Sequence, residues 1–384
     1  MSAPTLANSA PNSAPIPVTI VGAGKIGSSI AKLLALSGDY QLRVLDPNAD
    51  ALKALHSKVT VETRQISANE SLLPYLEQQA AVLAATAFDK NPDIARAALQ
   101  AGCSYFDLTE DTATTQTVRE LAQYARAGQI FMPQCGLAPG FIGILAHDMA
   151  KRFEQVDTVK MRVGALPQYP SNALKYNLTW STDGLINEYC NPCDAIRHGQ
   201  LLSVQALEGL EHFALDGLEY EAFNTSGGLG TLCETWLGRV ANMDYKTVRY
   251  IGHRDLMDFV INGLRMGASP ANRQQLKQIL EAAIPLTLQD VVLVFVTVSG
   301  YLDGQYRQIS DARKVYHRQL HGEAWSAIQL STASAAATAL DLHFQGQLPT
   351  KGFVSQDAIA LDQFLANRFG QHYAIDRYAE EIPV

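Results

Sequence analysis

One glycine-rich segment near the start of the chain, residues 18–27, constrains the fold most. A short apolar run breaks into the pattern G-x-G-x-x-G and is followed by the amphipathic spacing of a helix. Gly22 allows a tight turn, Gly24 lets the backbone approach a pyrophosphate, and Gly27 lets the helix pack closely on the strand. The phosphates would meet the N-terminus of that helix. The segment therefore predicts a dinucleotide-binding strand, turn and helix.

The acid that such a motif needs is also present. Residues 42–46 form a second apolar run that ends in Asp46, nineteen positions after Gly27, where a carboxylate can bond the ribose hydroxyls. A 2′-phosphate would be repelled there, so the sequence predicts NAD as the cofactor, held also by Lys25 and Ile26. The alternative is a glycine turn followed by a surface acid, which is disfavoured because turn, strand and acid agree.

The length and charge of the chain limit its class. With 384 residues it is too long for one ordinary core, so two domains are expected. A net charge of −8 argues against nucleic acid or an anionic membrane as a partner. Residues 1–16 lack Lys, Arg and an apolar core segment, and are expected to be a disordered tail rather than a signal peptide. The five cysteines follow no framework pattern, which favours a reduced, cytoplasmic protein.

Strand and helix patterns alternate from residue 17 to about residue 135. Six strands separated by helices predict an α/β fold with a doubly wound parallel sheet of the Rossmann type. The strands are expected at residues 18–21, 41–45, 59–61, 81–85, 104–108 and 129–132.

The pattern changes after residues 139–140. Longer alternating strands predict a mixed-sheet α+β domain for substrate binding and oligomerisation over residues 139–324. Residues 325–345 predict a helix that is buried on most faces. Residues 325–384 are expected to return to the NAD-binding domain of residues 17–138, which would place the active site in the cleft between the domains. The strands of the second domain are expected at 158–163, 177–181, 218–222, 247–250, 290–299 and 306–310, with a turn at 302–305 joining the last two.

Small residues follow two of the predicted strands at the edge that faces a cofactor. Ala85, Thr86 and Phe88 follow the fourth strand, and they are predicted to contact the cofactor, as are Cys135 and Gly136 after the sixth. A plain strand-to-helix turn would explain the first group equally well. Cys135 could also be an acid or a nucleophile, although such a cysteine is more often a small buried side chain.

Acidic residues follow the fifth strand. Asp107 and Glu110 are candidates for holding an ammonium group or for acid–base catalysis, and a structural role explains them equally well. Asp111 is expected to cap the next helix. His253 is the third candidate acid–base residue.

The densest mixture of polar and aromatic residues spans 164–189, and two shorter segments, 223–231 and 245–253, are similar. A pocket for an amino acid needs such variety, with donors for a carboxylate, acids for an ammonium group and rings for the stem. Arg249 is the best candidate for a bidentate carboxylate clamp, although a lone Arg is more often a surface residue. The other predicted substrate-binding residues are Asn172, Lys175, Tyr176, Trp180, Ser181 and Thr225.

Two spacings suggest a metal site at first sight. Cys190 and Cys193 form C-x-x-C, and His317 and His321 form H-x-x-x-H, but the two pairs lie too far apart for a zinc finger. Arg318 also stands where a metalloprotease would need Glu. No metal is therefore expected. Neither a P-loop nor G-x-S-x-G occurs, so kinase and hydrolase functions have no support.

Six strings occur in the order of a known family: VGAGKIG, FDLTED, CGLAPGF, RVGALPQYPSNALKYNLTWSTDGLINEY, EAFNTSGGLGTL and YKTVRYIGH. Together they resemble the saccharopine dehydrogenase-like family, and within it the bacterial L-lysine 6-dehydrogenases. The resemblance implies NAD-dependent oxidative deamination of L-lysine at its ε-carbon, with release of ammonia and formation of allysine (2-aminoadipate 6-semialdehyde), which cyclises to piperideine-6-carboxylate. It also implies a homodimer or homotetramer that binds its amino-acid substrate between two domains.

This function would give the candidate residues their roles. One of Asp107, Glu110 and His253 would exchange protons with the amine. Arg249 and Lys175 would hold the α-carboxylate. The stem would lie against Tyr176, Trp180 and Ser181, with hydrogen bonds from Asn172 and Thr225.

Other functions stay open. The family also includes enzymes that act on saccharopine and polyamine-forming reductases, but this chain has Ala138 where saccharopine reductases tend to have Asp, and Ala173 where they have Pro. An alternative of another class is a non-catalytic regulator that binds NAD. A need for glutamate or 2-oxoglutarate would identify a saccharopine enzyme, and tight NAD binding without turnover would identify a regulator.

Overall fold

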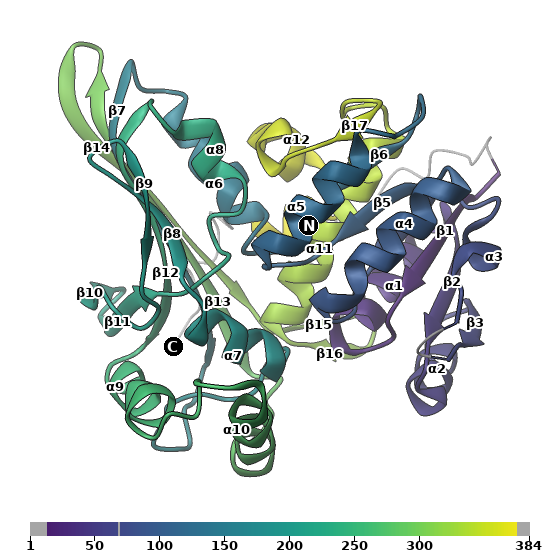
Figure 1. Ribbon diagram of the computed structural model, residues 1–384, viewed down its shortest axis with the longest axis horizontal. Coiled ribbons are helices and arrows are strands. Elements are labelled where there is room, and N and C mark those ends of the chain that lie inside the picture. Colours follow the sequence, from purple (N-terminus) through teal and green to yellow (C-terminus); the bar gives the residue numbers. More distant parts are fainter. Residues whose placement is uncertain (1–13, 68–69, 375–384) are drawn as a thin grey trace, which may run out of the picture.

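The structure is a computed structural model that describes residues 14–67 and 70–374, and it contains two large sheets (Figure 1). The first sheet has seven parallel strands in the order β17-β6-β5-β4-β1-β2-β3. The strand order reverses between β1 and β4, which in doubly wound sheets marks a ligand crevice at the carboxyl ends of the strands. The predicted Rossmann-type sheet is confirmed. Its strands are β1 (Ile16–Val21), β2 (Tyr40–Asp46), β3 (Glu62–Gln65), β4 (Ala81–Ala84), β5 (Ser104–Asp107), β6 (Ile130–Met132) and β17 (Gly352–Phe353).

Three details of this sheet differ from the expectation. The third strand starts later than residues 59–61, because the amides of Lys58 and Val59 still bond Leu55 at the end of the preceding helix. β17 was not predicted, since two residues carry no periodic pattern. Ile16, expected in the disordered tail, already pairs with Tyr40 in the sheet. Residues 1–13 of that tail lie outside the described part of the chain.

Helices pack on both faces of the first sheet. Polar side chains fix where two of them begin. Asn48 accepts hydrogen bonds from the amides of Asp50 and Ala51 at the start of α2. Asp111 accepts one from the amide of Thr114 at the start of α5, which confirms its predicted capping role. The helices are α1 (Lys25–Ser37), α2 (Ala49–His56), α3 (Leu73–Leu76), α4 (Asn91–Ala101) and α5 (Thr112–Ala122).

The second sheet is mixed, with the main order β10-β11-β12-β7-β13-β14 and with β8 paired to β12 and β9. β13 and β14 form the predicted hairpin, joined by Asp303 and Gly304 with φ of 52° and 69°. Two positive φ angles in succession suit the right-handed twist of a hairpin. The strands are β7 (Gln155–Pro167), β8 (Cys193–Arg197), β9 (Gln200–Val204), β10 (Glu211–Leu215), β11 (Leu218–Asn224), β12 (Val240–Tyr250), β13 (Asp290–Leu302) and β14 (Gln305–Tyr316), and β15 (Arg318–Leu320) and β16 (Glu323–Trp325) form a separate pair.

Residues 177–181 do not form the strand that was expected there. They are a loop in which Leu178 bridges Leu286, and they lead into α7 (Thr182–Cys190). Ser181 accepts a hydrogen bond from the amide of Gly184 and so caps that helix. The polar alternation of the segment thus reflects a helix start rather than an exposed strand. Three further helices were also not predicted: α8 (Leu232–Trp236), α9 (His253–Asp258), which runs into a π-helical turn (Phe259–Gly263), and α10 (Pro270–Ala283).

Two helices link the sheets. α6 (Phe141–Ala150) follows the turn after β6, and α11 (Ala327–Phe344) lies between the sheets and contacts α1, β5 and β13 (Figure 1). Fourteen of the residues of α11 are buried, which confirms the predicted buried helix; its small side chains let both layers approach it. α12 (Leu361–Ala366) follows β17. Within residues 14–67 and 70–374, no helix has the length and apolar character needed to cross a membrane.

Candidate active site between the two sheets

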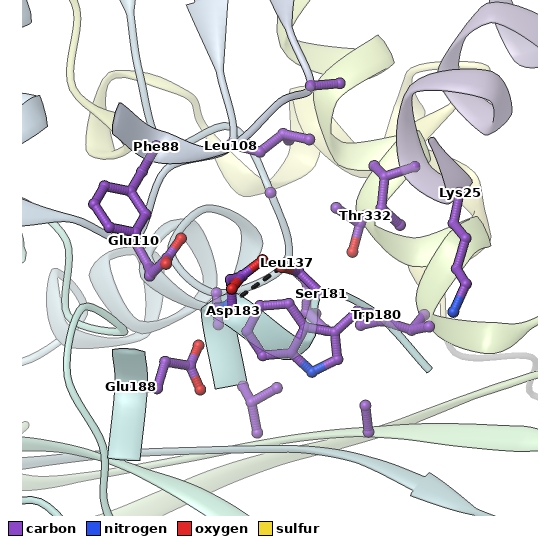
Figure 2. Close-up of a pocket in the computed structure, with 18 of the residues that line it drawn as sticks. Lys25, Phe88, Leu108, Glu110, Leu137, Trp180, Ser181, Asp183, Glu188 and Thr332 are labelled. Atoms are coloured by element: carbon purple, nitrogen blue, oxygen red, sulfur yellow. Dashed lines mark hydrogen bonds between the residues drawn. The ribbon is translucent and has the colours of Figure 1, made fainter. Parts of the chain in front are cut away.

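A cavity of about 460 Å³ lies between the two sheets (Figure 2). The first sheet lines it with the glycine turn, the loops after β4 and β5, and the turn after β6. The second sheet lines it with α7, β7 and β12, and α11 contributes Ile328 and Thr332. Charged side chains of both signs face this space: the cations Lys25 and Arg249, and the carboxyl groups Glu110, Asp183 and Glu188.

The glycine turn has the steric features that a dinucleotide requires. Gly22 has a φ of +110°, and a Cβ there would lie 2.3 Å from the carbonyl oxygen of Ala85. A Cβ on Gly27 would lie 2.0 Å from the carbonyl oxygen of Gly22, so α1 could not pack so closely on β1. A Cβ on Gly24 would meet no protein atom within 4 Å, and Gly24 lines the cavity. The space beside Gly24 is therefore open, where the motif places a pyrophosphate.

The charges around the turn also fit this ligand. No side chain caps the start of α1 and no acid lies in its first turn, so its amides can donate to an anion. Lys25 and Ile26 line the cavity from that turn. At the end of β2, the carboxylate of Asp46 accepts hydrogen bonds from the amides of Ala23 at 2.6 Å and Asn48 at 2.7 Å. These bonds fix the carboxylate beside the turn, where it can meet the ribose of a dinucleotide.

The predicted cofactor residues at the strand ends divide into two groups. Ala85, Thr86, Phe88 and Gly136 line the cavity. Cys135 does not; its thiol is buried and donates to the carbonyl oxygen of Met132 at 3.0 Å. Burial raises the pKa of the Cys135 thiol well above its ordinary value, and the nearby charge of Asp107 adds a smaller increase. Cys135 is thus a buried, protonated side chain rather than an acid or nucleophile of the cavity.

Arg249 is a buried cation whose guanidinium is held by neutral groups. Its Nε donates to the Tyr189 hydroxyl at 3.0 Å, and its Nη1 donates to the carbonyl oxygen of Val248 at 2.8 Å. The guanidinium carbon lies 5.0 Å from the ring centroid of Tyr176. In the described part of the chain it forms no ion pair, although a buried charge normally requires one. Since Arg249 faces the cavity, a ligand carboxylate can supply that partner.

His253 does not line the cavity and is connected to Arg249 through the Tyr189 hydroxyl group. Its Nδ1 donates to the carbonyl oxygen of Leu174 at 2.9 Å, which leaves Nε2 to accept from the Tyr189 hydroxyl at 3.0 Å. Burial is the main cause that lowers the pKa of His253 to about 3, and the charge of Arg249 lowers it further. A neutral imidazole with both nitrogens bonded has no free position for a substrate proton, and its contact with Tyr189 can orient the hydroxyl group to which Arg249 donates.

The carboxyl groups of Glu110 and Glu188 lie at one end of the cavity in the view of Figure 2, and Lys25 lies at the other. Burial raises the pKa of both acids. For Glu188 the pKa rises to about 8, because burial and the Glu110 charge outweigh the attraction of Arg249. Glu110 accepts a weak hydrogen bond from Nδ2 of Asn187 at 3.4 Å. The two acids together can hold a proton that an isolated carboxylate would release.

Asp107 lies beneath the cavity and does not line it. Its carboxylate accepts hydrogen bonds from the Tyr105 hydroxyl at 2.6 Å, the Thr109 amide at 2.9 Å and the Gln134 amide at 3.0 Å. Burial raises the pKa of Asp107 to about 6. With three donors around it, the carboxylate connects the end of β5 to the segment after β6. This contact is structural, which is one of the two roles that the sequence allowed for Asp107.

The predicted substrate-binding residues are also divided by the structure. Trp180, Ser181 and Arg249 line the cavity, and Tyr176 lies buried beneath Arg249. Three others are used elsewhere. The Asn172 side chain bonds the backbone of Tyr176, the exposed Lys175 donates to Ile251, and Thr225 is buried away from the cavity.

Several lining residues were not predicted as site residues. Tyr245 and Thr247 face the cavity with Arg249 because side chains two apart on β12 point to the same face. Once Arg249 had been selected, that alternation could have identified the other two. Asp183 and Glu188 stand in the polar segment 164–189, but the helix that brings them to the cavity was not recognised. In residues 14–67 and 70–374, no group of three or more His, Cys, Asp or Glu side chains could hold a metal ion.

Two family models match the chain. One, described as the saccharopine dehydrogenase NADP binding domain, covers residues 18–132, and the other, the saccharopine dehydrogenase C-terminal domain, covers residues 136–371. Their descriptions establish a nicotinamide dinucleotide as the class of cofactor.

Similar proteins and structures agree with this match. The mitochondrial α-aminoadipic semialdehyde synthases of Rattus norvegicus and Mus musculus are 20% and 21% identical over 300 residues, which is 73% of this chain. The match spans 31% of the length of each relative. Apo saccharopine dehydrogenase (L-Glu forming) from Saccharomyces cerevisiae has the same fold, with a TM-score of 0.74 at 13% identity over 93% of this chain and 96% of that one.

Proposed function

The chain belongs to the saccharopine dehydrogenase family of oxidoreductases, and we propose that it catalyses the NAD-dependent oxidative deamination of L-lysine at the ε-carbon. The balanced reaction is L-lysine + NAD⁺ + H₂O → allysine + NADH + NH₄⁺ + H⁺. The aldehyde, 2-aminoadipate 6-semialdehyde, would cyclise to piperideine-6-carboxylate. Relatives named for α-aminoadipic semialdehyde support a reaction of this chemical type.

The charges of the cavity carry the proposal. Lys25 lies beside the glycine turn, so Arg249 is the remaining lining cation for a substrate carboxylate, and it has no internal ion-pair partner in the described chain. Three carboxyl groups face the same space. Lysine brings one carboxylate and two ammonium groups, which matches this set of charges. Saccharopine would bring three carboxylates, and two of them would find no cation of their own.

The residues then divide the work of binding and proton transfer. The Arg249 guanidinium would hold the α-carboxylate through its terminal nitrogens. The stem would lie against the Trp180 ring, and the carboxyl groups of Glu110 and Glu188 would accept the ε-ammonium group. The glycine turn and Asp46 would hold the dinucleotide, which when bound supplies the hydride acceptor. Apolar side chains of the turn after β6 and of α11 would keep water from the reacting carbon.

Asp46 supports NAD rather than NADP, because its fixed carboxylate would repel a 2′-phosphate. Loss of a charged hydrogen bond costs about 1.5–3 kcal/mol. We therefore expect Asp46→Ala to raise the KM for NAD by roughly 10- to 100-fold and the KM for lysine by less than about twofold. Initial rates with each substrate varied would measure both. Equal effects on the two KM values, or wild-type preference for NADP, would contradict this assignment.

The activity is tested by following NADH absorbance with L-lysine, saccharopine, ornithine and diaminopimelate, together with an assay for ammonia. Reduction of NAD with lysine alone and release of one ammonia for each NADH would support the proposal. Turnover with saccharopine but not lysine would overturn the substrate and leave the cofactor assignment in place. Tight NAD binding without turnover of any amine would overturn the enzyme assignment.

We also propose that residues 17–138 and 325–374 form the NAD-binding domain and that residues 139–324 form the substrate-binding and oligomerisation domain of a cytoplasmic homodimer or homotetramer. The last part of the predicted NAD-binding domain, residues 375–384, lies outside the described residues. Light scattering during gel filtration would measure the mass of the assembly. A monomer at working concentration would contradict the oligomer.

A further inference from the structure

Glu188 is the most deeply buried of the three carboxyl groups that line the cavity. Its side chain is 8% exposed, whereas Asp183 is 53% exposed and pairs with Lys277. Among the described residues, none donates a hydrogen bond to the carboxyl group of Glu188, although that group faces the cavity. A carboxylate so placed is costly to ionise unless a cation or donor arrives. The cavity is the direction from which such a partner can come.

We propose that Glu188 is the base that takes a proton from the ε-ammonium group of the bound substrate. The neighbouring charge of Glu110 would determine the pH range in which Glu188 is ionised and can accept that proton. The inference rests on the proposed function, which supplies the amine. Glu188 projects from α7 and Glu110 from the loop after β5, so the two acids approach the amine from opposite domains.

The charges around Glu188 fit this role. The charge of Glu110 opposes ionisation of Glu188, and the charge of Arg249 favours it. The arrival of an ammonium group would therefore shift Glu188 to its ionised form. Cys193 and Tyr245 interact with the Glu188 charge and have raised pKa values themselves, so they stay neutral near pH 7. The groups that face Glu188 are Glu110 after β5, Tyr176 before α7, Tyr189 on α7, Cys193 on β8, and Tyr245 and Arg249 on β12.

The proton step balances within these groups. An N–H bond of the ε-ammonium group breaks, its electron pair stays on nitrogen, and the proton forms an O–H bond on the Glu188 carboxylate. After oxidation, water adds to the ε-carbon and one of its protons passes to solvent. As the C–N bond breaks, the nitrogen takes the Glu188 proton and the proton of the new hydroxyl group, so it departs as ammonium, the aldehyde remains and the Glu188 carboxylate is restored. An amine with an ordinary pKa of about 10.4 needs such a base near neutral pH.

The kinetic test compares wild type with Glu188→Gln, Glu188→Asp and Glu110→Gln over pH 6 to 10. In the wild type, kcat/KM should fall on the acidic side with an apparent pKa near 8. Glu188→Gln should lose this acidic limb and about 100- to 10,000-fold of kcat. Glu188→Asp should recover part of kcat together with the limb. Glu110→Gln should move the limb to lower pH, because the neighbouring negative charge is removed.

Asp194→Asn is the matched control. Desolvation also raises the pKa of this acid, but Asp194 is an exposed residue on β8 and lies outside the cavity. The same change from acid to amide should therefore leave both kcat and the pH profile unchanged. The comparison separates a specific loss at Glu188 from a general effect of altering an acid in this domain.

A binding test that needs no turnover uses the full chain and calorimetry at pH 7 in buffers of different ionisation enthalpy. Lysine should release up to one proton on binding, because the ε-ammonium group ionises Glu188. L-norleucine has the same α-carboxylate and α-ammonium group without the ε-nitrogen and should release none. Glu188→Gln should bind lysine without proton release.

The outcomes separate the inference from the proposed function. If lysine is oxidised but Glu188→Gln keeps the acidic limb, or norleucine releases as many protons as lysine, the inference is wrong and the function stands. If another amine of the panel is the substrate, the same variants are compared with that amine, and an unchanged profile overturns the inference. Absence of both lysine binding and amine turnover would overturn both.

Discussion

The two walls of the cavity are built in different ways. The wall from the first sheet is largely backbone, and the glycines that shape it lie within residues 22–27. The wall from the second sheet consists of side chains brought together from α7 and β12, which are distant in sequence. The first wall depends on local sterics and can be inferred from a short motif. The second depends on helix starts and strand facing, which only the folded chain defines.

The largest expected effect separates two glycines of the same motif. Gly27→Ala should lower the free energy of unfolding by about 3 kcal/mol, because the new Cβ would overlap the backbone of Gly22. Gly24→Ala should fold normally, because nothing lies within 4 Å of its Cβ, but should weaken NAD binding about tenfold. Thermal unfolding and NAD titration measure the two effects. Equal loss of stability in both variants would show that Gly24 is structural rather than open to a ligand.

The sequence indicated the first wall almost completely. The Rossmann-type sheet followed from the alternation of strands and helices, and Gly24, Lys25, Ile26, Ala85, Thr86, Phe88 and Gly136 all line the cavity. Gly22, Gly27 and Asp46 shape or flank the turn without lining the cavity. Cys135 points away from it, since position after a strand does not reveal which way a side chain points. Motifs that depend on backbone geometry leave a readable pattern because few residues can adopt the required conformation.

The second wall was predicted only in part. Polarity selected Lys175 and Thr225 as well as Arg249, but Lys175 is exposed and bonds Ile251, and Thr225 packs elsewhere. Along β12, Arg249 faces the cavity, while Lys246 faces the other side of the sheet and pairs with Glu211. A polar strand with charges on both faces does not show which face meets the ligand. Sequence patterns could not supply that choice.

Variants of Arg249 and Lys175 test directly which basic side chains of the second wall contact the ligand. Arg249→Lys should lower kcat/KM for lysine about 100-fold, or about 2.7 kcal/mol, because an ammonium group cannot reproduce the bidentate guanidinium contact. Lys175→Met should change kcat/KM by less than about twofold, since the side chain points away from the cavity. Steady-state kinetics with lysine and NAD would measure both. A larger loss in Lys175→Met would restore it as a carboxylate-binding residue and contradict the structure.

The pH dependence of stability gives the next effect. The pKa of Glu188 rises from 4.5 to about 8 on folding, so the unfolded chain ionises this group at lower pH than the folded chain does. Stability is therefore lost as the pH rises from about 4.5 to 8, and the cost persists above that range. Each pKa unit of the shift corresponds to about 1.4 kcal/mol of stability. We expect about half of the full shift to appear in the free energy of unfolding at high pH, which is about 2 kcal/mol.

Urea unfolding of wild type and Glu188→Gln at pH 5 and pH 9 measures this cost. The two proteins should be similar in stability at pH 5, and the variant should be more stable by about 2 kcal/mol at pH 9. Asp194→Asn should show a much smaller change. A wild type that is as stable as Glu188→Gln at pH 9 would mean that Glu188 is not held in a low-polarity environment.

The smallest expected effect concerns the support behind the second wall. Tyr189 receives a hydrogen bond from Arg249 and donates one to His253, so Tyr189→Phe removes both while keeping the ring. The Tyr189 hydroxyl only orients the Arg249 guanidinium and does not touch the substrate, so the KM for lysine should rise about fivefold, or about 1 kcal/mol, with kcat nearly unchanged. Tyr220→Phe, a buried tyrosine away from the cavity, is the control. A fall in kcat at constant KM would instead place Tyr189 or His253 in proton transfer, and the acid–base role predicted for His253 would then be correct.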